Sequence, residues 1–432
     1  MNWKLVKSIE MNVLFLVHSY SDVEHGGESR IPWDLSLALS RRAVNIFVMT
    51  AYKSISSGTK LPPNIKVYQV PFGKHFPSWD QGNMFLIFLF SLPLFLIKKI
   101  DVIHVASTLE ATPFNLFKVR PLIQSAHPLW PYNDPQFQED LAFDRKHKLA
   151  ESGVPSLSLK DKIINKIAAV FFRVFGVRER LDPRTDLYIV REKAFYRELT
   201  EKGFKTVYIS NGVDFARFAG EPKIKRSDQS FTPLEVARPI GPSGAQARAR
   251  LLTGFTFLYI GKLCKRKGVH HLIPAFQKLS REYPDAKLIC AGDSSPEGFR
   301  LFRAMADDNP QIIFQSGLSN DDVIELYKQG DAFVLPILCG PFNLVVLEAM
   351  ASGLPVIVSR CSGSADPVID GKTGLLTEVA DVEDIYQKMK YLYEHREETK
   401  QMGRNAREEA KKYSWDEVAE ETMRAYEGVL GK

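Results

Sequence analysis

Cysteine is scarce in this chain of 432 residues, and its spacing argues against two kinds of stabilisation. The four cysteines all lie in the second half, and no two are spaced as closely as the ligands of a structural metal site. The pattern therefore predicts no metal site and favours reduced thiols in a cytosolic protein over a disulfide framework. The four are Cys264, Cys290, Cys339 and Cys361.

Long apolar runs are also missing. Near the N-terminus the only such run is Val13 to Val17, which fits a strand and is too short for a signal peptide. The most apolar stretch, Met84 to Ile97, falls short of the ~18 to 20 residues that span a bilayer, and Pro93 interrupts it. Two interpretations stay open: a helix that covers a sheet, or a helix partly inserted into a membrane face, which Lys98 and Lys99 favour.

Nucleic-acid modules, short internal repeats and low-complexity tracts are absent, and the net charge of +6 is modest, so no nucleic-acid partner is expected. The positive charge is concentrated between Lys146 and Arg184, where basic residues alternate with large aliphatic ones. This alternation is typical of an amphipathic helix on anionic headgroups. A helical insertion packed on its own domain explains it equally well.

The length predicts two or three domains, because one ordinary core rarely extends over 432 residues. Strand-like runs followed by helical patterns recur in both halves, which predicts two α/β units with parallel sheets. A stretch without clear period, Gly220 to Gly254, is interpreted as the connection. The strands are expected at 11–17, 45–50, 101–105, 122–126, 186–190 and 207–210, and then at 255–260, 287–291, 312–315, 332–336 and 356–358.

One segment, Leu338 to Val358, carries a single charge, Glu348. Apolar side chains cover every face of its predicted helix, so the helix is expected to be buried on all sides. Asn343 is expected to cap the helix and Gly353 to end it. The lone carboxylate must be hydrogen-bonded, paired or close to a cleft, since burying it alone is costly. Glu348 is therefore a candidate ligand-binding residue, with the holding of a neighbouring loop as the alternative.

A lysine-rich loop follows the first strand of the second half. It runs from Gly261 to Gly268, contains Lys262 and Lys267, and leads into a helix. In a β-loop-α-β unit, loop amides and helix N-termini lie at the carboxyl edge of the sheet, where phosphates bind. Together with the helix that starts at Asn343, the two lysines predict a nucleotide-diphosphate site. A solvated run of charges is the alternative.

Two features of the first half also fall at strand ends. Gly26 and Gly27 follow the first strand and let the backbone approach a ligand closely. His127 ends a later strand, at the edge where ligands bind. Its imidazole either accepts a hydrogen bond from a substrate or satisfies a loop carbonyl.

Taken together, these pieces resemble a glycosyltransferase of family 4, which has the two-domain GT-B fold. They occur in the family's order over almost the whole chain, and those in the second half are the most specific. The pieces are Gly26-Gly27, His127, Asn211-Gly212-Val213-Asp214, Gly261-Lys262 with Lys267-Gly268, Ala291-Gly292-Asp293, and Pro341 to Met350.

The resemblance implies a fold of two Rossmann-like α/β domains that face each other across a cleft, with a C-terminal helix that crosses back to the first domain. The expected organisation is an acceptor-binding domain at 1–214 with a basic helical insertion at about 131–185, a connection at 215–254, a nucleotide-sugar-binding domain at 255–412 and the returning helix at 413–432.

The resemblance also implies a reaction. A hexose-type sugar passes from a nucleotide-diphosphate sugar, bound as co-substrate, to a saccharide or lipid-linked acceptor, with retained anomeric configuration and without metal or other cofactor. His127 contacts the donor sugar, Lys262 and Lys267 neutralise the leaving diphosphate, and Glu348 holds the ribose hydroxyls. Further binding residues are Gly26, Gly27, Gly261, Asp293, Gly340, Asn343, Leu344 and Val345.

Two positions depart from the family pattern. The family has a second Glu eight positions before Glu348, and here that position is Gly340; where it has Gly after Pro-Phe, this chain has Asn343. The missing carboxylate normally touches donor hydroxyls. Two hypotheses follow: an enzyme whose pocket is adapted to another sugar, or a nucleotide-sugar-binding protein with weakened catalysis that acts as a sensor or assembly partner. The expected location is the cytoplasm, with contact to the inner face of the membrane as an option.

Overall fold

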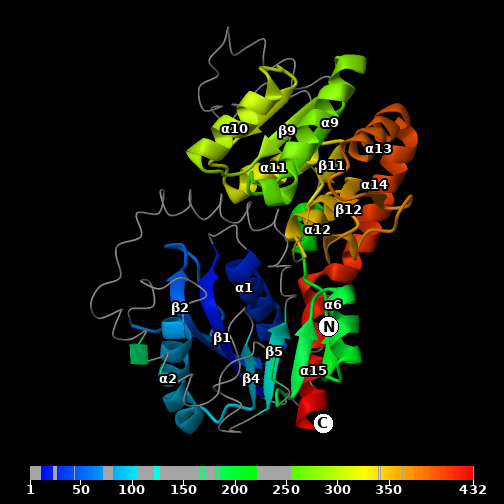
Figure 1. The fold of residues 1–432 in the computed structure, drawn as a ribbon. Coiled ribbons are helices and arrows are strands. Elements are labelled where there is room, and N and C mark those ends of the chain that lie inside the picture. The colour runs from blue at the N-terminus through cyan, green and yellow to red at the C-terminus, as the bar shows by residue number, and fades with distance from the viewer. Residues whose placement is uncertain are drawn as a thin grey trace. The chain divides into compact units, whose positions relative to one another are not determined.

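The computed structural model describes residues 11–22, 27–42, 44–71, 81–105, 121–126, 166–167, 170, 181–182, 184–220, 254–338, 340, 342–361 and 363–431. They form two compact units, which are described separately (Figure 1). The N-terminal unit comprises the described residues up to Gly212 together with those from Trp415 onward. The C-terminal unit comprises the described residues from Val213 to Ser414. The predicted sites Gly26 and His127, and most of the basic insertion, lie outside the described residues.

The N-terminal unit is built on a parallel sheet. In the described part its seven strands have the order β3-β2-β1-β4-β5-β6-β7, so the chain winds outward from β1 in both directions. The strands are β1 Met11–Ser21, β2 Val44–Ser54, β3 Ile65–Gln69, β4 Val102–Val105, β5 Leu122–Ala126, β6 Leu187–Val190 and β7 Thr206–Tyr208. The longer helices are α1 Gly27–Ser40, α2 Gln81–Ile97, α6 Lys193–Glu201 and α15 Trp415–Leu430.

Helices cover both faces of this sheet. One face, which includes Leu14 and Leu16, forms a common core with buried side chains of α2. The opposite face carries His104, whose Nδ1 lies 2.7 Å from the hydroxyl of Tyr426 on α15 and whose Nε2 lies 3.0 Å from Ser125 Oγ. Complete burial lowers the pKa of His104 to about 3, with the charge of Arg191 as a second cause. A neutral imidazole therefore joins the last helix of the chain to this sheet.

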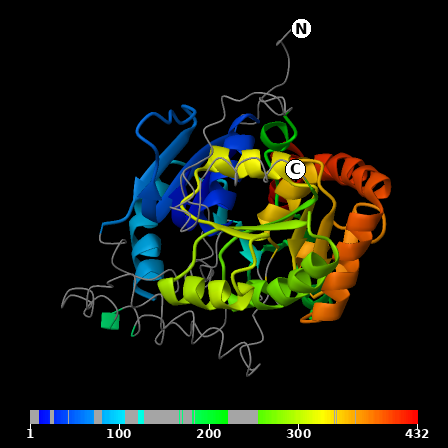
Figure 2. The same cartoon turned by 90° about the horizontal axis from the view of Figure 1, so that it is seen from above.

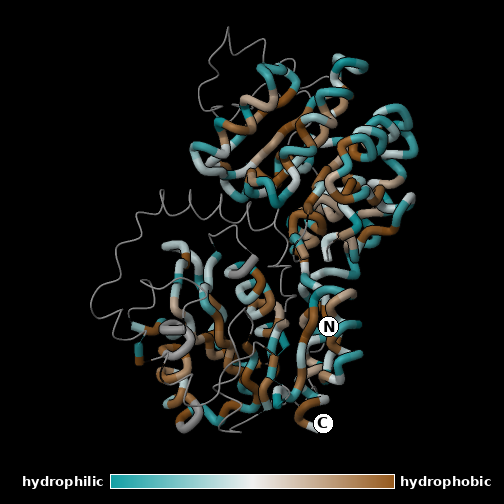
Figure 3. The backbone as a smooth tube through the Cα atoms, in the orientation of Figure 1, coloured by the Kyte–Doolittle hydropathy of each residue, from teal (hydrophilic) through white to brown (hydrophobic). Residues whose placement is uncertain are grey.

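The C-terminal unit contains a second parallel sheet, with the order β10-β9-β8-β11-β12-β13 among the described residues. Its core is one continuous cluster of buried apolar side chains, and Figure 3 shows its strands mainly in brown. The strands are β8 Thr256–Ile260, β9 Lys287–Ala291, β10 Ile312–Gln315, β11 Ala332–Leu335, β12 Val356–Ser359 and β13 Gly374–Thr377. The α-helices are α7 Phe215–Phe218, α9 Val269–Glu282, α10 Pro296–Ala306, α11 Asn320–Gln329, α12 Leu344–Ala351, α13 Val382–Glu394 and α14 Arg396–Ala410. Figure 2 shows α9 and α10 in yellow-green, and α13 and α14 in orange.

The predicted α/β organisation is confirmed, and each strand expected from the sequence is present within a few residues. Two strands, β3 and β13, were not predicted. Each lies at an edge of its sheet. In β3 only Ile65 is buried, so the apolar signal is weak. Edge strands have one unpaired side and need less apolar character than central ones.

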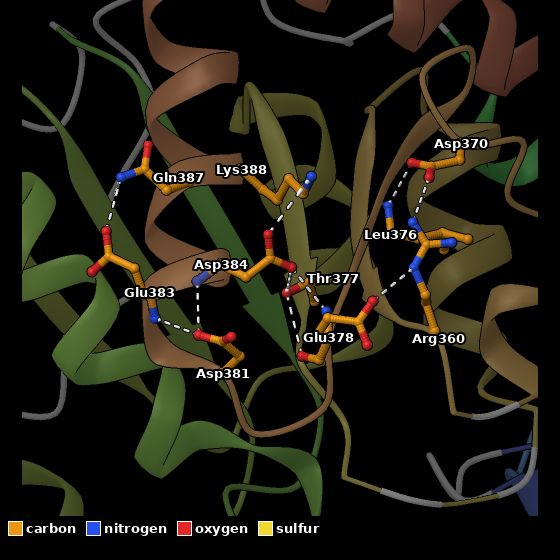
Figure 4. Close-up of polar contacts among 10 residues, drawn as sticks. All are labelled: Arg360, Asp370, Leu376, Thr377, Glu378, Asp381, Glu383, Asp384, Gln387 and Lys388. Atoms are coloured by element: carbon orange, nitrogen blue, oxygen red, sulfur yellow. Dashed lines mark hydrogen bonds and ion pairs between the residues drawn. The ribbon is translucent and has the colours of Figure 1, made fainter.

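Charged side chains attach the edge strand β13 to its surroundings (Figure 4). Arg360 at the end of β12 pairs with Asp370 at 2.7 Å and with Glu378 at 3.2 Å. The Asp384 carboxylate on α13 accepts hydrogen bonds from Thr377 Oγ1 and from the amide of Glu378, both at 2.8 Å. These contacts hold the chain after β12 and β13 and leave Arg360 already engaged with two carboxylates.

In the described part of the chain, the passage from Gly212 to Val213 lies beside the passage from Ser414 to Trp415. The indole of Trp415 packs so closely on Gly212 that a Cβ there would lie 2.5 Å from the ring. The amide of Val213 donates to the carbonyl of Tyr413 at 2.8 Å. The return at Ser414 to Trp415 places α15 in the N-terminal unit, where Arg41, the residue after α1, pairs with Asp416 at 2.8 Å.

Candidate functional site

The lysine-rich loop leaves the carboxyl end of β8 in a conformation that requires glycine. Gly261 and Gly292, which follow the neighbouring strands β8 and β9, have φ angles of 147° and 149°. A Cβ on Gly292 would lie 1.9 Å from the carbonyl oxygen of Gly261. Backbone therefore packs directly on backbone at this edge, which any larger residue at position 292 prevents.

Asp293, a predicted binding residue, connects loops at the same edge. Its carbonyl accepts a hydrogen bond from the amide of Leu263 at 2.8 Å, and its carboxylate accepts one from the amide of Gly317 at 3.3 Å. The carbonyl of Lys262 accepts a hydrogen bond from the hydroxyl of Tyr259 at 2.7 Å, while the Lys262 side chain is exposed. Asp293 thus has a structural role in these contacts, and Lys262 presents its charge to solvent.

The lysine-rich loop also packs against the loop that follows β11. Gly268 has a φ of 76°, and a Cβ there would lie 1.8 Å from the carbonyl oxygen of Pro336. Next to this contact, the amide of Leu338 donates to the carbonyl of Arg266 at 3.0 Å. Because β8 and β11 are neighbours in the sheet, the two loops meet at its carboxyl edge.

Asn343 joins three loops, and this differs from the cap that the sequence predicts. It is the N-cap residue of α12, but its side chain makes no capping hydrogen bond. Instead its Oδ1 accepts from the ammonium group of Lys267, and its Nδ2 donates to Ser364 Oγ at 2.6 Å. The prediction of a side-chain cap is therefore wrong, because the amide group has stronger partners across the sheet edge: a cation from the β8 loop and a hydroxyl from the β12 loop.

Glu348 has a hydrogen-bond partner that the sequence did not indicate. The hydroxyl of Tyr327 on α11 lies 3.0 Å from Glu348 Oε2 and 3.2 Å from the carbonyl of Val345. Tyr327 is fully buried, and burial together with the negative charge of Glu348 raises its pKa well above the usual value. The phenol therefore stays protonated and donates to the half-buried carboxylate, which confirms that this lone acid is hydrogen-bonded.

The body of α12 is packed as the sequence predicts, whereas its first turn is not fully covered. Val346, Leu347 and the side chains from Ala349 to Ala351 are buried, while Leu344 and Val345 are half-buried. The helix ends at Gly353, as predicted, with a φ of 85°. The amide of Gly353 donates a hydrogen bond to the carbonyl of Met350, and the amide of Leu354 donates one to the carbonyl of Ala349. These are the two hydrogen bonds of a Schellman motif. The more accessible end of α12 is thus its N-terminal end, where the amides of a helix have no acceptor within the helix.

The electrostatic character of this edge is basic. Lys262, Lys265, Arg266 and Lys267 lie within six residues, three of them half-buried. Burial, and then the neighbouring His271 and Lys265, lower the pKa of His270 to about 4, so His270 is neutral near pH 7. The cations next to the first turn of α12 suit a phosphate group, which the helix N-terminus and ammonium groups attract together.

Gly340 lies in the β11 loop with a φ of 149°. This is a backbone conformation that side-chain-bearing residues rarely adopt. The backbone conformation at position 340 therefore favours glycine. A glutamate there would require the loop to adopt a different backbone conformation.

The structure brings together Lys267, Asn343 and the first turn of α12, with Glu348 one turn further along the same helix. Gly261, Lys262, Asp293 and Gly340 lie on the loops of the same sheet edge. Gly27 begins α1 in the N-terminal unit. Two contacting residues were missed, Tyr327 and Ser364. Ser364 follows the strand β12, so its position after a strand of the parallel sheet could have indicated it. The contact of Tyr327 with Glu348 joins two helices, and no sequence pattern indicates it.

Part of the chain is similar in sequence to known glycosyltransferases. Residues 246–409 match the family model described as glycosyl transferases group 1. The sulfoquinovosyl transferase SQD2 of Arabidopsis thaliana is 35% identical over 163 residues, which cover 37% of this chain and 30% of SQD2. Glycogen synthase of Mycobacterium tuberculosis is 28% identical over 261 residues, 59% of this chain and 57% of that enzyme. The matches thus span 30% to 57% of the length of these relatives.

Solved structures resemble almost the whole chain. Sucrose-phosphate synthase from Thermosynechococcus elongatus has a TM-score of 0.66 at 18% identity, covering 98% of this chain and 100% of that one. HepE of Anabaena, solved with UDP, has a TM-score of 0.64 at 16% identity, covering 97% and 100%. The fold is therefore the GT-B fold of glycosyltransferases, and the C-terminal unit carries sequence similarity to glycosyl transferases group 1.

Proposed function

We propose that the protein is a retaining glycosyltransferase of family 4 that moves a hexose-type sugar from a nucleotide-diphosphate sugar to a saccharide or lipid-linked acceptor. The C-terminal unit binds the nucleotide, and no metal or further cofactor takes part. The similarity of residues 246–409 to glycosyl transferases group 1 supports this proposal, as does HepE, which has the same fold and was solved with UDP and with UDP-glucose.

One observation carries the proposal. Lys267, from the loop after β8, donates a hydrogen bond to Asn343 at the start of α12, and Asn343 in turn contacts Ser364 after β12. Three neighbouring strand ends therefore supply a cation, a helix N-terminus and a hydroxyl to one spot. These are the groups that bind a diphosphate.

In this proposal the residues of the edge act mainly on the leaving group. The bond between the anomeric carbon and the diphosphate breaks early, so negative charge grows on the diphosphate. Lys262, Lys267 and the amides of Leu344 and Val345 stabilise that charge, while the amide of Asn343 donates to Ser364 Oγ at 3.1 Å. Glu348, held by Tyr327, accepts hydrogen bonds from the ribose hydroxyls. Fixed donors aimed at developing charge are usually the largest contribution to such catalysis.

The site is tested by binding of UDP and GDP to the full chain, measured by calorimetry. Lys267→Ala removes a charge-assisted contact, and we expect affinity for the preferred nucleotide to fall about 10- to 100-fold. Glu348→Gln should weaken it by a similar order through the ribose. Lys278→Ala is the matched control, because Lys278 is an exposed lysine paired with Glu383 on the outer helices. Unchanged affinity in both site variants contradicts the placement of the site.

Turnover separates the enzyme from the alternative, a nucleotide-sugar-binding protein that acts as a sensor or assembly partner. Gly340 is the observation that favours the alternative, because no carboxylate is present at that position to touch the donor sugar. The full chain is incubated with a panel of nucleotide sugars and acceptors, and release of nucleoside diphosphate is measured. Release that requires an acceptor supports the transferase. Tight nucleotide binding without release from any donor supports the alternative.

A further inference from the structure

Among the described residues, the largest group of exposed apolar side chains lies on one helix, α2. The described residues expose nine large apolar side chains, and four of them fall within nine positions of α2. Their exposed fractions are 45% for Leu89, 41% for Phe90, 37% for Leu92 and 66% for Ile97. A soluble monomer rarely leaves apolar residues grouped in this way, and such a group commonly marks a surface that binds a partner or a membrane.

The exposed residues of α2 form one side of a two-sided helix. Ile87, Phe88 and Leu94 are buried in the core against the sheet, whereas Leu89, Phe90 and Ile97 face away from it. Positions 89, 93 and 97 follow one another every four residues, and Pro93 between the other two is also exposed. The helix continues through Pro93. The sheet thus accounts for one side of α2, which supports the covering-helix interpretation, and leaves the other side apolar and open.

Positive charge follows this open side directly. α2 contains no charged residue, and Lys98 and Lys99 come immediately after its last residue. The first acid after the two lysines, Asp101, accepts a hydrogen bond from the amide of Asn12 at 2.8 Å and so is directed to the sheet. An apolar helix side followed by lysines suits a bilayer surface, where the apolar side enters the acyl boundary and the ammonium groups remain among the phosphates.

A second exposed group of the same kind lies in the N-terminal unit. Ile167 and Val170 are 51% and 61% exposed, and Lys166 beside them is exposed as well. The segment from Lys146 to Arg184 that contains them has nine Lys and Arg against four Asp and Glu. Six of the nine exposed apolar residues therefore belong to stretches with an excess of lysine and arginine. This positive charge favours an anionic partner surface over a neutral or basic one.

We propose that the outer side of α2, with Leu89, Phe90, Leu92 and Ile97, lies in the interface of an anionic membrane, with Lys98 and Lys99 on lipid phosphates. Among the described helices none has the length and apolar character needed to cross a bilayer, so the contact is peripheral. The inference is independent of the proposed sugar transfer, because it concerns only the surface of the N-terminal unit.

The experiment is co-sedimentation of the full chain with vesicles, without nucleotide or sugar. Vesicles of phosphatidylcholine mixed with phosphatidylglycerol are compared with vesicles of phosphatidylcholine alone, at low and at high salt. We expect binding to the anionic vesicles, weakened by salt. The combined change Leu89→Ser, Phe90→Ser and Ile97→Ser should lower the partition coefficient more than tenfold. The change Lys98→Gln with Lys99→Gln should lower it about fivefold for each lysine, on anionic vesicles only.

The matched control is Ile369→Ser with Val379→Ser in the C-terminal unit, where each side chain is 40% exposed. It removes two exposed apolar side chains that lie outside α2 and should leave partition unchanged. Circular dichroism and thermal unfolding of all variants show that the apolar variant is folded, and unchanged affinity for UDP and GDP shows that the two sites are separate.

Three results overturn the proposal. The first is no binding of the unmodified chain to anionic vesicles at low salt, and the second is equal binding of the apolar variant. The third is a dimer, found by analytical ultracentrifugation, that the apolar variant abolishes while vesicle partition stays the same. That result assigns the outer side of α2 to a second copy of the chain. Equal partition of the Lys98 and Lys99 variant removes the two lysines from the contact.

Discussion

Two helices of similar composition, α2 and α12, meet different surroundings. α12 has one charged residue and α2 has none, and each is bordered by chain that forms a strand. Yet α12 buries the apolar side chains that follow its first turn, whereas α2 keeps one apolar side exposed. An apolar sequence therefore predicts that a helix avoids water, but the neighbours available in the fold decide whether it can. Where neighbours cover only one side, the remainder is a surface for another partner.

The largest expected effect comes from truncating the buried helix. Leu347→Ala removes a fully buried side chain from the core of the C-terminal unit. We expect the free energy of unfolding to fall by about 2 to 5 kcal/mol, because the lost burial is joined by the cost of a cavity. Urea unfolding of the full chain, followed by circular dichroism, measures the change. A loss below about 1 kcal/mol contradicts the close packing of α12.

An intermediate effect is expected at the contact between α11 and α12. Tyr327→Phe leaves Glu348 without its hydroxyl partner, and the change should cost about 1 to 2 kcal/mol of unfolding free energy. It should also weaken UDP or GDP binding severalfold if Tyr327 holds Glu348 for the ribose. Tyr391→Phe is the control, since Tyr391 donates to Glu398 at 2.5 Å on the surface, where the loss is small. Equal effects of both changes contradict a special role for the buried pair.

The smallest effect is expected on the outer side of α2. Leu89→Ala should change the unfolding free energy by less than about 0.5 kcal/mol, because the side chain is 45% exposed and contributes little burial. Leu94→Ala on the same helix is the comparison, with 7% exposure and an expected loss of about 2 kcal/mol or more. Thermal unfolding of both variants checks this. Similar losses remove the distinction between the two sides of α2.

Local rules predicted much of the fold. Runs such as Leu122 to Ala126 and Lys287 to Ala291 are strands at the expected residues, because their apolar character and flanking turn residues leave few alternatives. The end of α12 at Gly353 follows from the freedom of glycine at positive φ. The edge strands β3 and β13 were not predicted, because an edge strand has a neighbour on one side only and needs no continuous apolar run.

The candidate site was predictable to a smaller degree. Strand-end loops pointed to Lys267, Asn343 and Glu348, since parallel strands bring their carboxyl ends to one edge. The partners of these residues did not follow from the sequence. Asn343 looked like a helix cap by residue type, and only the tertiary structure placed Lys267 and Ser364 within its reach.

The sequence by itself determined the alternation of strands and helices, the glycines that let the loops at the strand ends pack closely, and the apolar character of α2 and α12. These depend on near neighbours in the chain, for which propensity and periodicity suffice. The tertiary structure alone decided that Tyr327 holds Glu348, that Asn343 connects three loops, and that α2 is covered on one side only. Contacts across 21 residues or more depend on which surfaces the folded chain brings together, and no local pattern specifies them.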